Sequence, residues 1–523
     1  MNVEKVLIDG AWGESTGRET FQAVNPQTGQ TLPGEYPVSP WNEIERAVRA
    51  ASAAAWRVRG WAGERFAAFL DAFAARLEKR ADELIAMAHA ETALAVEPRL
   101  KSVELPRTVN QLRQAAAAAR DGSWVQATID TKANIRSMYA PIGPVVVFGP
   151  NNFPFAFNGA AGGDFAAAIA AGNPVIAKGH TSHPGTSRLL AEEAHQASLE
   201  TDLPSGFVQL IYRTSHSDGE RLVAHPLIGA TGYTGSRQAG LRLKEAADRA
   251  GKPIYLELSS INPVFILPGA LEERLEDVAQ EFATSCLMGT GQFCTNPGLV
   301  VLIGNETGEK FVEAVRQRFA QAPAGTLLGA GVQRNLVQSV RALVAAGARS
   351  VIGGNPQSGP AIRCENTLLR VDGETLLAHA EALQTEAFGN ESLFVVAKDE
   401  QQLLQIVGTL EGNLTGCIYS HRGGADDALY ERVAPLLRAR VGRLLNDKMP
   451  TGVAVSPAMN HGGPFPATGH PGFTAVGIPA SLLRFAMLEC YDNVRPHRLP
   501  PALRDANPTG QMWRFVDGTW TQN

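Results

Sequence analysis

The spacing of hydrophobic positions changes along the chain. From about residue 40 to residue 120, apolar residues recur at three- and four-residue steps, as in GERFAAFLDAFAARLEKR, which predicts amphipathic helices. Residues 1–37 carry turn residues between apolar pairs and predict short strands. Residues 124–140 alternate and are polar enough to predict an exposed hairpin.

A different pattern begins at residue 144. Short apolar runs, each followed by a turn, alternate with helical segments, and this predicts a parallel, doubly wound sheet. The pattern resumes after residue 298, so a second α/β domain is predicted. Helices are predicted at about 157–171, 184–199 and 237–250, and the strands include PVVVFGP, PVIAKG, GFVQLIY, LIGATGYTGS, PIYLEL, LVVLI, SLFVVA and GCIYS.

Composition limits the partners to be expected. The 523 residues carry a net charge of -5, which gives no reason to expect nucleic acid or a membrane surface as partner. Five cysteines without disulfide or zinc spacing favour a reducing compartment, and eleven histidines lack companions at ligand spacing, so no metal site is predicted. The first residues do not resemble a signal peptide, and no segment is apolar enough to span a bilayer. We therefore expect a cytoplasmic protein that acts on small molecules.

Two segments carry side chains suited to nucleophilic chemistry. Cys294 lies in GTGQFCTNPG, where glycines give room for a substrate, although a buried structural cysteine is the alternative. Glu257 ends an apolar strand, where partial burial would suit a general base, or it is an ion-paired glutamate. Asn152 in GPNNFPFAFN is a potential oxyanion donor or a simple turn residue.

Other segments are candidates for cofactor binding. Lys178 follows a strand in VIAKGHTSHPG and is placed to contact the ribose or phosphate of a dinucleotide. The glycine-flanked helix start in ATGYTGSRQAG would favour a pyrophosphate, although the usual GxGxxG fingerprint is absent from the first strand–helix turn. Glu386, in QTEAFGNES, taken alone is a loop residue.

The order of these segments resembles that of the aldehyde dehydrogenase superfamily over nearly the whole chain. The resemblance rests on blocks that also occur in this order in the family. These are NNFP (151–154), Lys178, GYTGS (232–236), ELSS-INP (257–263), GQFCTNPG (291–298), EAFG (386–389) and HGGPFPATG (461–469).

The resemblance implies a domain organisation. Two doubly wound α/β domains with a small β extension for oligomerisation are expected. Residues 1–123 and 141–264 would bind the dinucleotide, and 265–475 would carry the catalytic cysteine. Residues 124–140 and 476–505 would form the extension of a homodimer or homotetramer.

The resemblance also implies residue roles. Cys294 would attack the aldehyde, Asn152 and the backbone N–H of Cys294 would hold the oxyanion, and Glu257 would activate the hydrolytic water. The cofactor would contact residues of both domains, namely Lys178, Gly232, Ser236, Glu386 and Phe388. Phe155, Phe157, Phe465 and Phe473 are expected near the substrate, with Phe157, Phe465 and Phe473 as the substrate contacts.

Departures from common family patterns narrow the expectation. Asn151 stands where members often have tryptophan, and HGGPFPATG replaces the usual FGG loop. These variants resemble a branch that contains 2,5-dioxopentanoate (α-ketoglutarate semialdehyde) dehydrogenases and an NADP-dependent fatty aldehyde dehydrogenase. Thr181 stands where a glutamate often favours NAD, and Arg213 offers a cation for a 2′-phosphate. NADP is therefore the expected preference, with NAD also usable.

Alternatives to this function remain at this point. The substrate could be a long-chain or other apolar aldehyde instead of 2,5-dioxopentanoate, because phenylalanines suit both. A CoA-acylating enzyme would not need a water-activating base such as Glu257. A non-catalytic protein on the same fold would not need Cys294, Glu257, Asn152 and Lys178 together.

Overall fold

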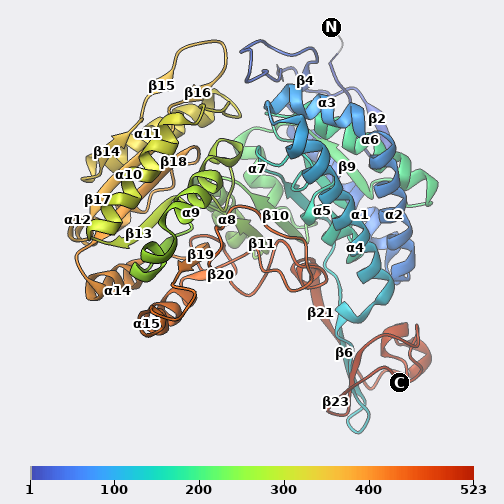
Figure 1. Ribbon diagram of the computed structural model, residues 1–523. Coiled ribbons are helices and arrows are strands. Elements are labelled where there is room, and N and C mark those ends of the chain that lie inside the picture. Colours follow the sequence, from blue (N-terminus) through green and yellow to red (C-terminus); the bar gives the residue numbers. More distant parts are fainter. Residues whose placement is uncertain (1–2) are drawn as a thin grey trace.

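The computed structural model describes residues 3–523, which form two seven-stranded sheets and a smaller β extension (Figure 1). The first sheet has the order β11-β10-β7-β8-β9-β1-β2. Its five parallel strands are β7 (Val145–Phe148), β8 (Val175–Lys178), β9 (Val208–Ile211), β10 (Ala230–Thr234) and β11 (Ile254–Glu257), and its antiparallel edge is β1 (Val6–Ile8) and β2 (Ala11–Gly13).

Helices surround this first sheet because their apolar sides are buried against it and against one another. They are α1 (Trp41–Val58), α2 (Gly63–Lys79), α3 (Ala81–Thr92), α4 (Leu105–Asp121), α5 (Gly163–Ala170), α6 (Pro184–Glu200), α7 (His216–Val223) and α8 (Arg237–Arg249). All eight residues of α5 are buried, and its alanines allow close packing.

The second sheet has the order β14-β17-β18-β13-β12-β19-β20 and is parallel except at β14. Its strands are β12 (Val264–Ile266), β13 (Leu299–Ile303), β14 (Arg349–Ile352), β17 (Thr367–Asp372), β18 (Glu391–Ala397), β19 (Asn413–Tyr419) and β20 (Val441–Asn446). The helices with it are α9 (Pro268–Leu287), α10 (Glu306–Gln321), α11 (Ala330–Ala345), α12 (Gly373–Ala378), α13 (Ala380–Leu383), α14 (Glu400–Thr409) and α15 (Asp427–Arg438). The predicted α/β fold with two doubly wound domains is thus confirmed.

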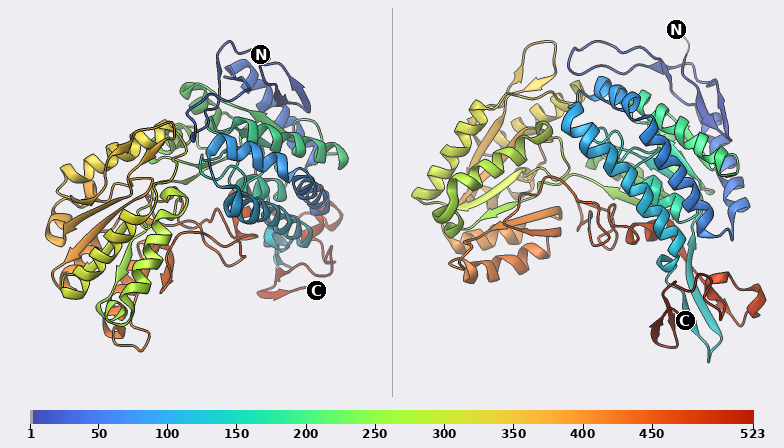
Figure 2. Two further views of the ribbon diagram at one scale, coloured as in Figure 1. Left: turned by 45° about the horizontal axis from the view of Figure 1, so that its top comes forward. Right: turned by 45° about the vertical axis from the view of Figure 1, so that its right-hand side comes forward.

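The extension projects away from the first domain (Figure 2). It is a five-stranded sheet of order β21-β6-β5-β22-β23, formed by β5 (Thr128–Asp130), β6 (Ile135–Pro141), β21 (Ala486–Asp492), β22 (Arg514–Val516) and β23 (Thr519–Thr521). The predicted hairpin corresponds to β5 and β6. The extension continues past the expected limit at residue 505, because β22 pairs with β5.

Smaller differences from the predicted elements have local causes. The helix predicted over 157–171 begins only at Gly163. The preceding residues turn tightly instead, since a side chain at Gly162 would come within 2.5 Å of the backbone of Phe157. Two short ribbons, β3 (Thr20–Phe21) with β4 (Tyr36–Pro37) and β15 (Pro356–Gln357) with β16 (Arg363–Cys364), complete the strands.

The chain between β20 and β21 runs between the two domains (Figure 1). This segment, residues 447–485, has little regular structure apart from a short 3-10 helix over Ala480–Phe485. It brings late residues of the chain to the carboxyl end of β11, where parallel α/β sheets place their functional groups. Within residues 3–523, no helix is both long and apolar enough to cross a membrane.

Candidate active site

Three side chains from distant parts of the sequence meet between the two domains. Glu257 is the last residue of β11, Cys294 lies in the loop between α9 and β13, and His461 lies in the 447–485 segment. The Nε2 atom of His461 lies 2.8 Å from Oε1 of Glu257 and 3.5 Å from Sγ of Cys294. Their ligand-type atoms all lie within 4.8 Å of one another. The structure thus brings the two predicted catalytic residues together and adds a third.

Backbone pairing fixes His461 at this position. Glu257 and Thr468 form an antiparallel bridge, and the N–H of Leu258 donates to the carbonyl of Ala467 over 2.8 Å. The N–H of His461 donates to the hydroxyl of Thr474 over 2.8 Å. The late segment is therefore attached directly to the strand that carries the glutamate.

The cysteine loop is held by buried amides. The side-chain amide of Asn262 donates to the carbonyls of Cys294 and Asn296, each over 2.9 Å. Gly291 has φ +66°, and a side chain there would come within 2.0 Å of the carbonyl of Gly389. Glycine therefore lets the cysteine loop touch the loop that follows Glu386.

Electrostatics assign the resting protonation of the pair. Burial tends to raise the pKa of Glu257, but His461, a hydrogen bond from Cys294 and the charge of Arg484 together lower it below its usual value. Burial, followed by the negative charge of Glu257, raises the pKa of the Cys294 thiol well above its usual range. The resting site thus holds a protonated thiol beside an ionised carboxylate, which is a nucleophile next to its base.

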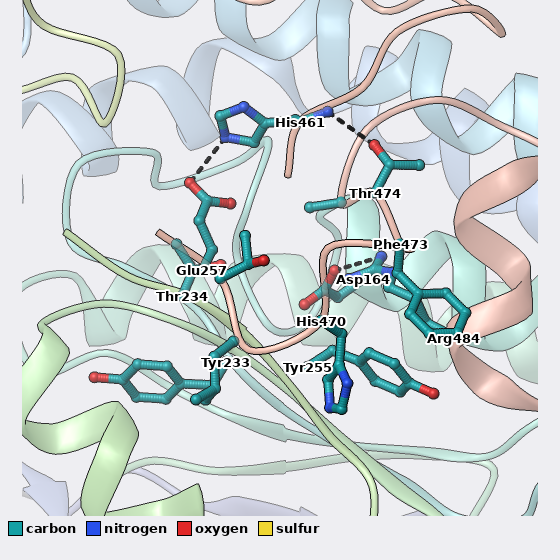
Figure 3. Close-up of a pocket in the computed structure, with 13 residues that line it drawn as sticks. Asp164, Tyr233, Thr234, Tyr255, Glu257, His461, His470, Phe473, Thr474 and Arg484 are labelled. Atoms are coloured by element: carbon teal, nitrogen blue, oxygen red, sulfur yellow. Dashed lines mark hydrogen bonds and ion pairs between the residues drawn. The ribbon is translucent and has the colours of Figure 1, made fainter. Parts of the chain in front are cut away.

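A small cavity lies against Glu257 (Figure 3). Its volume of about 20 Å³ is enough for about one water molecule. The Oε2 atom of Glu257 is buried and has no hydrogen-bond partner within residues 3–523. The lining residues include Thr234, Tyr255, Glu257, His461, Phe473 and Arg484. A water in this cavity would have a free carboxylate oxygen available to it.

The predicted oxyanion donor lies next to the cysteine loop. Asn152 is 5% exposed, and its Nδ2 donates to the carbonyl of Gln292 over 3.0 Å. Its own carbonyl accepts from Nη2 of Arg99 over 2.8 Å. An amide nitrogen can donate two hydrogen bonds, and this one makes a single bond within residues 3–523.

Lys178 is the last residue of β8, and Arg213 follows β9. Burial and, secondarily, the charge of Arg213 lower the pKa of Lys178 to about 8. Thr181 is partly buried three residues after Lys178, and Arg213 is exposed. Two cations and a hydroxyl therefore gather at neighbouring strand ends, and this set of groups fits the anionic end of a dinucleotide.

Two predicted cofactor residues in ATGYTGS have different surroundings. Ser236 caps α8, with its hydroxyl accepting from the N–H of Ala239 over 3.4 Å, so it stands at a helix N-terminus that favours a phosphate. Gly232 is buried within β10, where a side chain would come within 2.4 Å of Asp164. This packing against Asp164 explains why position 232 is a glycine, and it could not be predicted from the sequence.

Glu386 and Phe388 line one small cavity together with Phe293. Burial raises the pKa of Glu386 to about 7, opposed by hydrogen bonds from Ser259 and Ser260. This cavity is beside the cysteine loop, which is where the ribose and nicotinamide of a bound dinucleotide would have to reach.

The predicted phenylalanines separate into two groups. The ring of Phe157 is buried 5.9 Å from that of His461, and Phe473 lines the cavity beside Glu257. Phe155 is fully buried in the core of the first domain. Phe465 is 59% exposed beside Gly412, so the structure does not bring it to the other substrate candidates. The sequence of this irregular loop does not indicate which of its side chains are exposed and which are buried.

His461 is the main residue that the sequence analysis missed. It was set aside because no ligand-type companion lies near it in sequence, yet Cys294 and Glu257 are 167 and 204 positions away and adjoin it in space. Thiolate, imidazole and carboxylate are also a donor set suited to Zn²⁺. One signal in the sequence could have indicated His461: it stands at the position where the family usually has the phenylalanine of its FGG loop.

Comparison with known proteins identifies the class and then the family. A doubly wound sheet of the kind that binds dinucleotides, next to a second α/β domain, is the arrangement of an oxidoreductase. The model described as "Aldehyde dehydrogenase family" matches residues 12–463, and the chain belongs to this family. It is therefore an enzyme that oxidises an aldehyde to an acid with a nicotinamide cofactor.

Relatives with assigned names cover the whole chain. Alpha-ketoglutaric semialdehyde dehydrogenase 2 of Azospirillum brasilense is 37% identical over 99% of both chains. The alpha-ketoglutaric semialdehyde dehydrogenase of Acinetobacter baylyi is 35% identical over 96% of both. The crystal structure of PnpE in complex with nicotinamide adenine dinucleotide superposes with a TM-score of 0.79 at 18% identity, covering 95% of this chain and 99% of that one, and supports the fold.

Proposed function

We propose that this enzyme oxidises 2,5-dioxopentanoate to 2-oxoglutarate through Cys294, with Glu257 as the base. The observation that carries the proposal is the contact between the Cys294 thiol, His461 and the ionised Glu257. The names of the two relatives above point to this semialdehyde as substrate.

In the first half-reaction, Glu257 takes the thiol proton and Sγ of Cys294 attacks the aldehyde carbon. The Asn152 amide and the Cys294 backbone N–H stabilise the resulting oxyanion of the thiohemiacetal. When bound, the nicotinamide accepts the hydride that leaves this carbon, and a thioester remains on Cys294. Lys178, the N-terminus of α8 with Ser236, and Glu386 with Phe388 are the residues that would hold the dinucleotide.

Glu257 then releases the thiol proton to solvent. In the second half-reaction, the ionised Glu257 takes a proton from water, which attacks the thioester; the acid leaves, and the proton on Glu257 returns to Sγ to restore the thiol. The small cavity beside Oε2 of Glu257 is a suitable place for this water. We assign His461 as a positioning residue, because its bond to Oε1 orients the carboxylate and leaves Oε2 free.

NADP is the proposed preferred cofactor, with NAD also accepted. The support is the neutral Thr181 and the nearby cations Lys178 and Arg213, which would attract a 2′-phosphate. Activity with NAD and none with NADP would refute this preference.

A long-chain aldehyde is the second candidate substrate. It is favoured by the apolar cluster of Phe153, Phe157, Phe293 and Val476 near the site. Kinetics with 2,5-dioxopentanoate, succinate semialdehyde, glutarate semialdehyde, glutaraldehyde and decanal, each with NADP and NAD, would separate the candidates. We expect the highest kcat/KM for 2,5-dioxopentanoate, and comparable values across the panel would count against it.

The nucleophile has a direct test. Cys294→Ala removes the only atom that can form the thioester, so turnover should be lost while dinucleotide binding, measured by fluorescence or calorimetry, stays within about twofold. Cys286→Ala is a matched control, because Cys286 is fully buried and its thiol pKa is raised by burial. An active Cys294→Ala enzyme would exclude the proposed chemistry.

We also propose a homodimer or homotetramer that assembles through the β extension. Met487, Leu488 and Trp520 are large apolar residues of this sheet that are 46%, 59% and 54% exposed. Such residues on a projecting sheet are typical of an interface.

A further inference from the structure

Arg107 lies on the substrate side of the catalytic cluster. It is in the first turn of α4, and its guanidinium carbon lies 5.3 Å from the ring centre of Phe157 and 5.7 Å from that of Phe153. The ring of Phe157 in turn lies 5.9 Å from that of His461, which contacts Cys294. Two side chains, Phe157 and His461, therefore link Arg107 to the nucleophile.

Arg107 is partly exposed, and its guanidinium has no ion-pair partner within residues 3–523. Its Nε and Nη2 atoms are buried without a hydrogen bond to any of the same residues. The nearby Glu104 cannot serve, because one of its oxygens bonds Arg99 and the other accepts from the N–H groups of Phe155 and Ala156.

Arg99 provides the contrast on the same wall. Its guanidinium also faces aromatic rings, at 4.4 Å from that of Phe153, but it is bonded to Glu104 and to the carbonyl of Asn152. The hydrogen bonds of Arg99 thus explain its position in the structure, whereas Arg107 makes no such bonds within residues 3–523. Burying an unpaired charge destabilises a protein, so its presence calls for a ligand.

The charge of Arg107 acts on the catalytic cluster. It opposes the rise in the pKa of Cys294, which places it within electrostatic range of the thiol. Burial, the largest cause, lowers the pKa of Arg107 itself, but a guanidinium stays charged at neutral pH. A fixed cation therefore lies within electrostatic range of the proposed nucleophile.

We propose that Arg107 binds a carboxylate at the far end of the substrate, so that the enzyme selects aldehydes whose chain ends in an acid group. This rests on the proposed aldehyde oxidation at Cys294 and deepens it. Phe153 and Phe157 exclude water beside the guanidinium, which strengthens a bidentate bond to a carboxylate. A fatty aldehyde would leave the buried cation unpaired and would therefore be disfavoured.

The test compares two substrates of equal chain length. 5-Oxopentanoate and pentanal both have five carbons, and only the first ends in a carboxylate. In Arg107→Met, kcat/KM for 5-oxopentanoate should fall about 30-fold or more, mainly through KM, because one partner of a buried charge pair is lost. The value for pentanal should stay within about threefold. An equal loss with both substrates would overturn the proposal.

Two further variants separate binding from folding. Arg113→Met, on the same helix, removes an exposed arginine that pairs with Glu78 over 2.6 Å, and should leave both substrates unaffected. Arg107→Lys keeps the charge without the fork and should retain part of the preference for 5-oxopentanoate. The Tm of Arg107→Met should equal or exceed that of the wild type, since an unpaired buried charge is removed. A lower Tm together with an equal loss for both substrates would mean a structural role and refute the inference.

The outcome for Arg107 is distinguishable from that for the proposed function. If the wild type oxidises 5-oxopentanoate better than 2,5-dioxopentanoate but Arg107→Met shows the selective loss, the proposed substrate is wrong and the carboxylate site stands. If the wild type prefers 2,5-dioxopentanoate but Arg107→Met loses no more kcat/KM for 5-oxopentanoate than for pentanal, the proposed function stands and the carboxylate site is refuted.

Discussion

At the residue scale, the two oxygens of the proposed base have different surroundings. Oε1 of Glu257 contacts His461, and Oε2 has no hydrogen-bond partner within residues 3–523. Burial and, secondarily, this carboxylate raise the pKa of the neighbouring Cys294 thiol, so the resting thiol is protonated. A resting thiol of this kind is protected against oxidation and alkylation, because the thiolate is the reactive form.

This balance predicts opposite effects of one substitution. Glu257→Gln removes the negative charge beside Cys294 and should lower the thiol pKa, so alkylation by iodoacetamide at pH 8 should become faster. Turnover should fall about 10²- to 10⁴-fold, because the base is lost. Peptide mass spectrometry distinguishes Cys294 from the exposed Cys490. Slower alkylation of Cys294 in the variant would contradict the proposed electrostatics.

Site residues could be predicted from the sequence only where the neighbouring residues indicated their role. Cys294 in its glycine-rich loop and Glu257 at its strand end stand out within about ten residues of sequence. His461 does not stand out, because Cys294 and Glu257 are far from it in sequence. Arg107 does not stand out either, because no partner for its charge is found within residues 3–523. Phe465 and Phe473 are equivalent in a loop sequence, and only the folded path makes one exposed and the other part of the site.

At the element scale, the parallel strands of the first domain place the cofactor residues. Lys178 ends β8 and Arg213 follows the adjacent strand β9, and the two strands pair in register from Val175 with Val208 to Lys178 with Ile211. The alternation of strands and helices was readable from the sequence, so the positions of these strand ends could be predicted. The late start of α5 could not be predicted, because it depends on the close packing of Gly162 against the backbone of Phe157.

The depressed pKa of Lys178 predicts a pH dependence of cofactor binding. Its folded pKa is about 8, so the ammonium is present below pH 8 and is lost as the pH rises above it. The Kd for NADP should therefore rise up to tenfold between pH 8 and pH 9.5, and the Kd for NAD should rise less. Thr181→Glu should weaken the binding of NADP, because the carboxylate would repel the 2′-phosphate, and should leave the binding of NAD unchanged. A flat NADP profile in calorimetric titrations would contradict the assignment.

At the scale of the whole molecule, the β extension joins an early segment, residues 128–141, to the late residues 486–521. Its strand β21 pairs along its length with β6, from Ala486 with Pro141 to Asp492 with Ile135. β21 is an edge strand, with Met487 and Leu488 exposed on it. Such an edge is available for pairing with another subunit.

This arrangement predicts a change in assembly without a change in fold. Leu488→Glu places a charge on the edge strand and should shift the mass, measured by light scattering, towards the monomer. Trp56→Glu is the control, because Trp56 is 70% exposed on α1, outside the extension, and its substitution should leave the mass unchanged. An unaltered mass for Leu488→Glu would place the interface elsewhere.

The attachment of the 447–485 segment to β11 also has a consequence for protein synthesis. Glu257 and Cys294 leave the ribosome long before His461, and the pairing of Leu258 with Ala467 cannot form until most of the chain has been made. Domains generally fold as they emerge, N-terminal part first. A nascent chain would therefore carry a folded first sheet while its thiol still lacked the contact with His461, and that contact would form only when residues 447–485 dock.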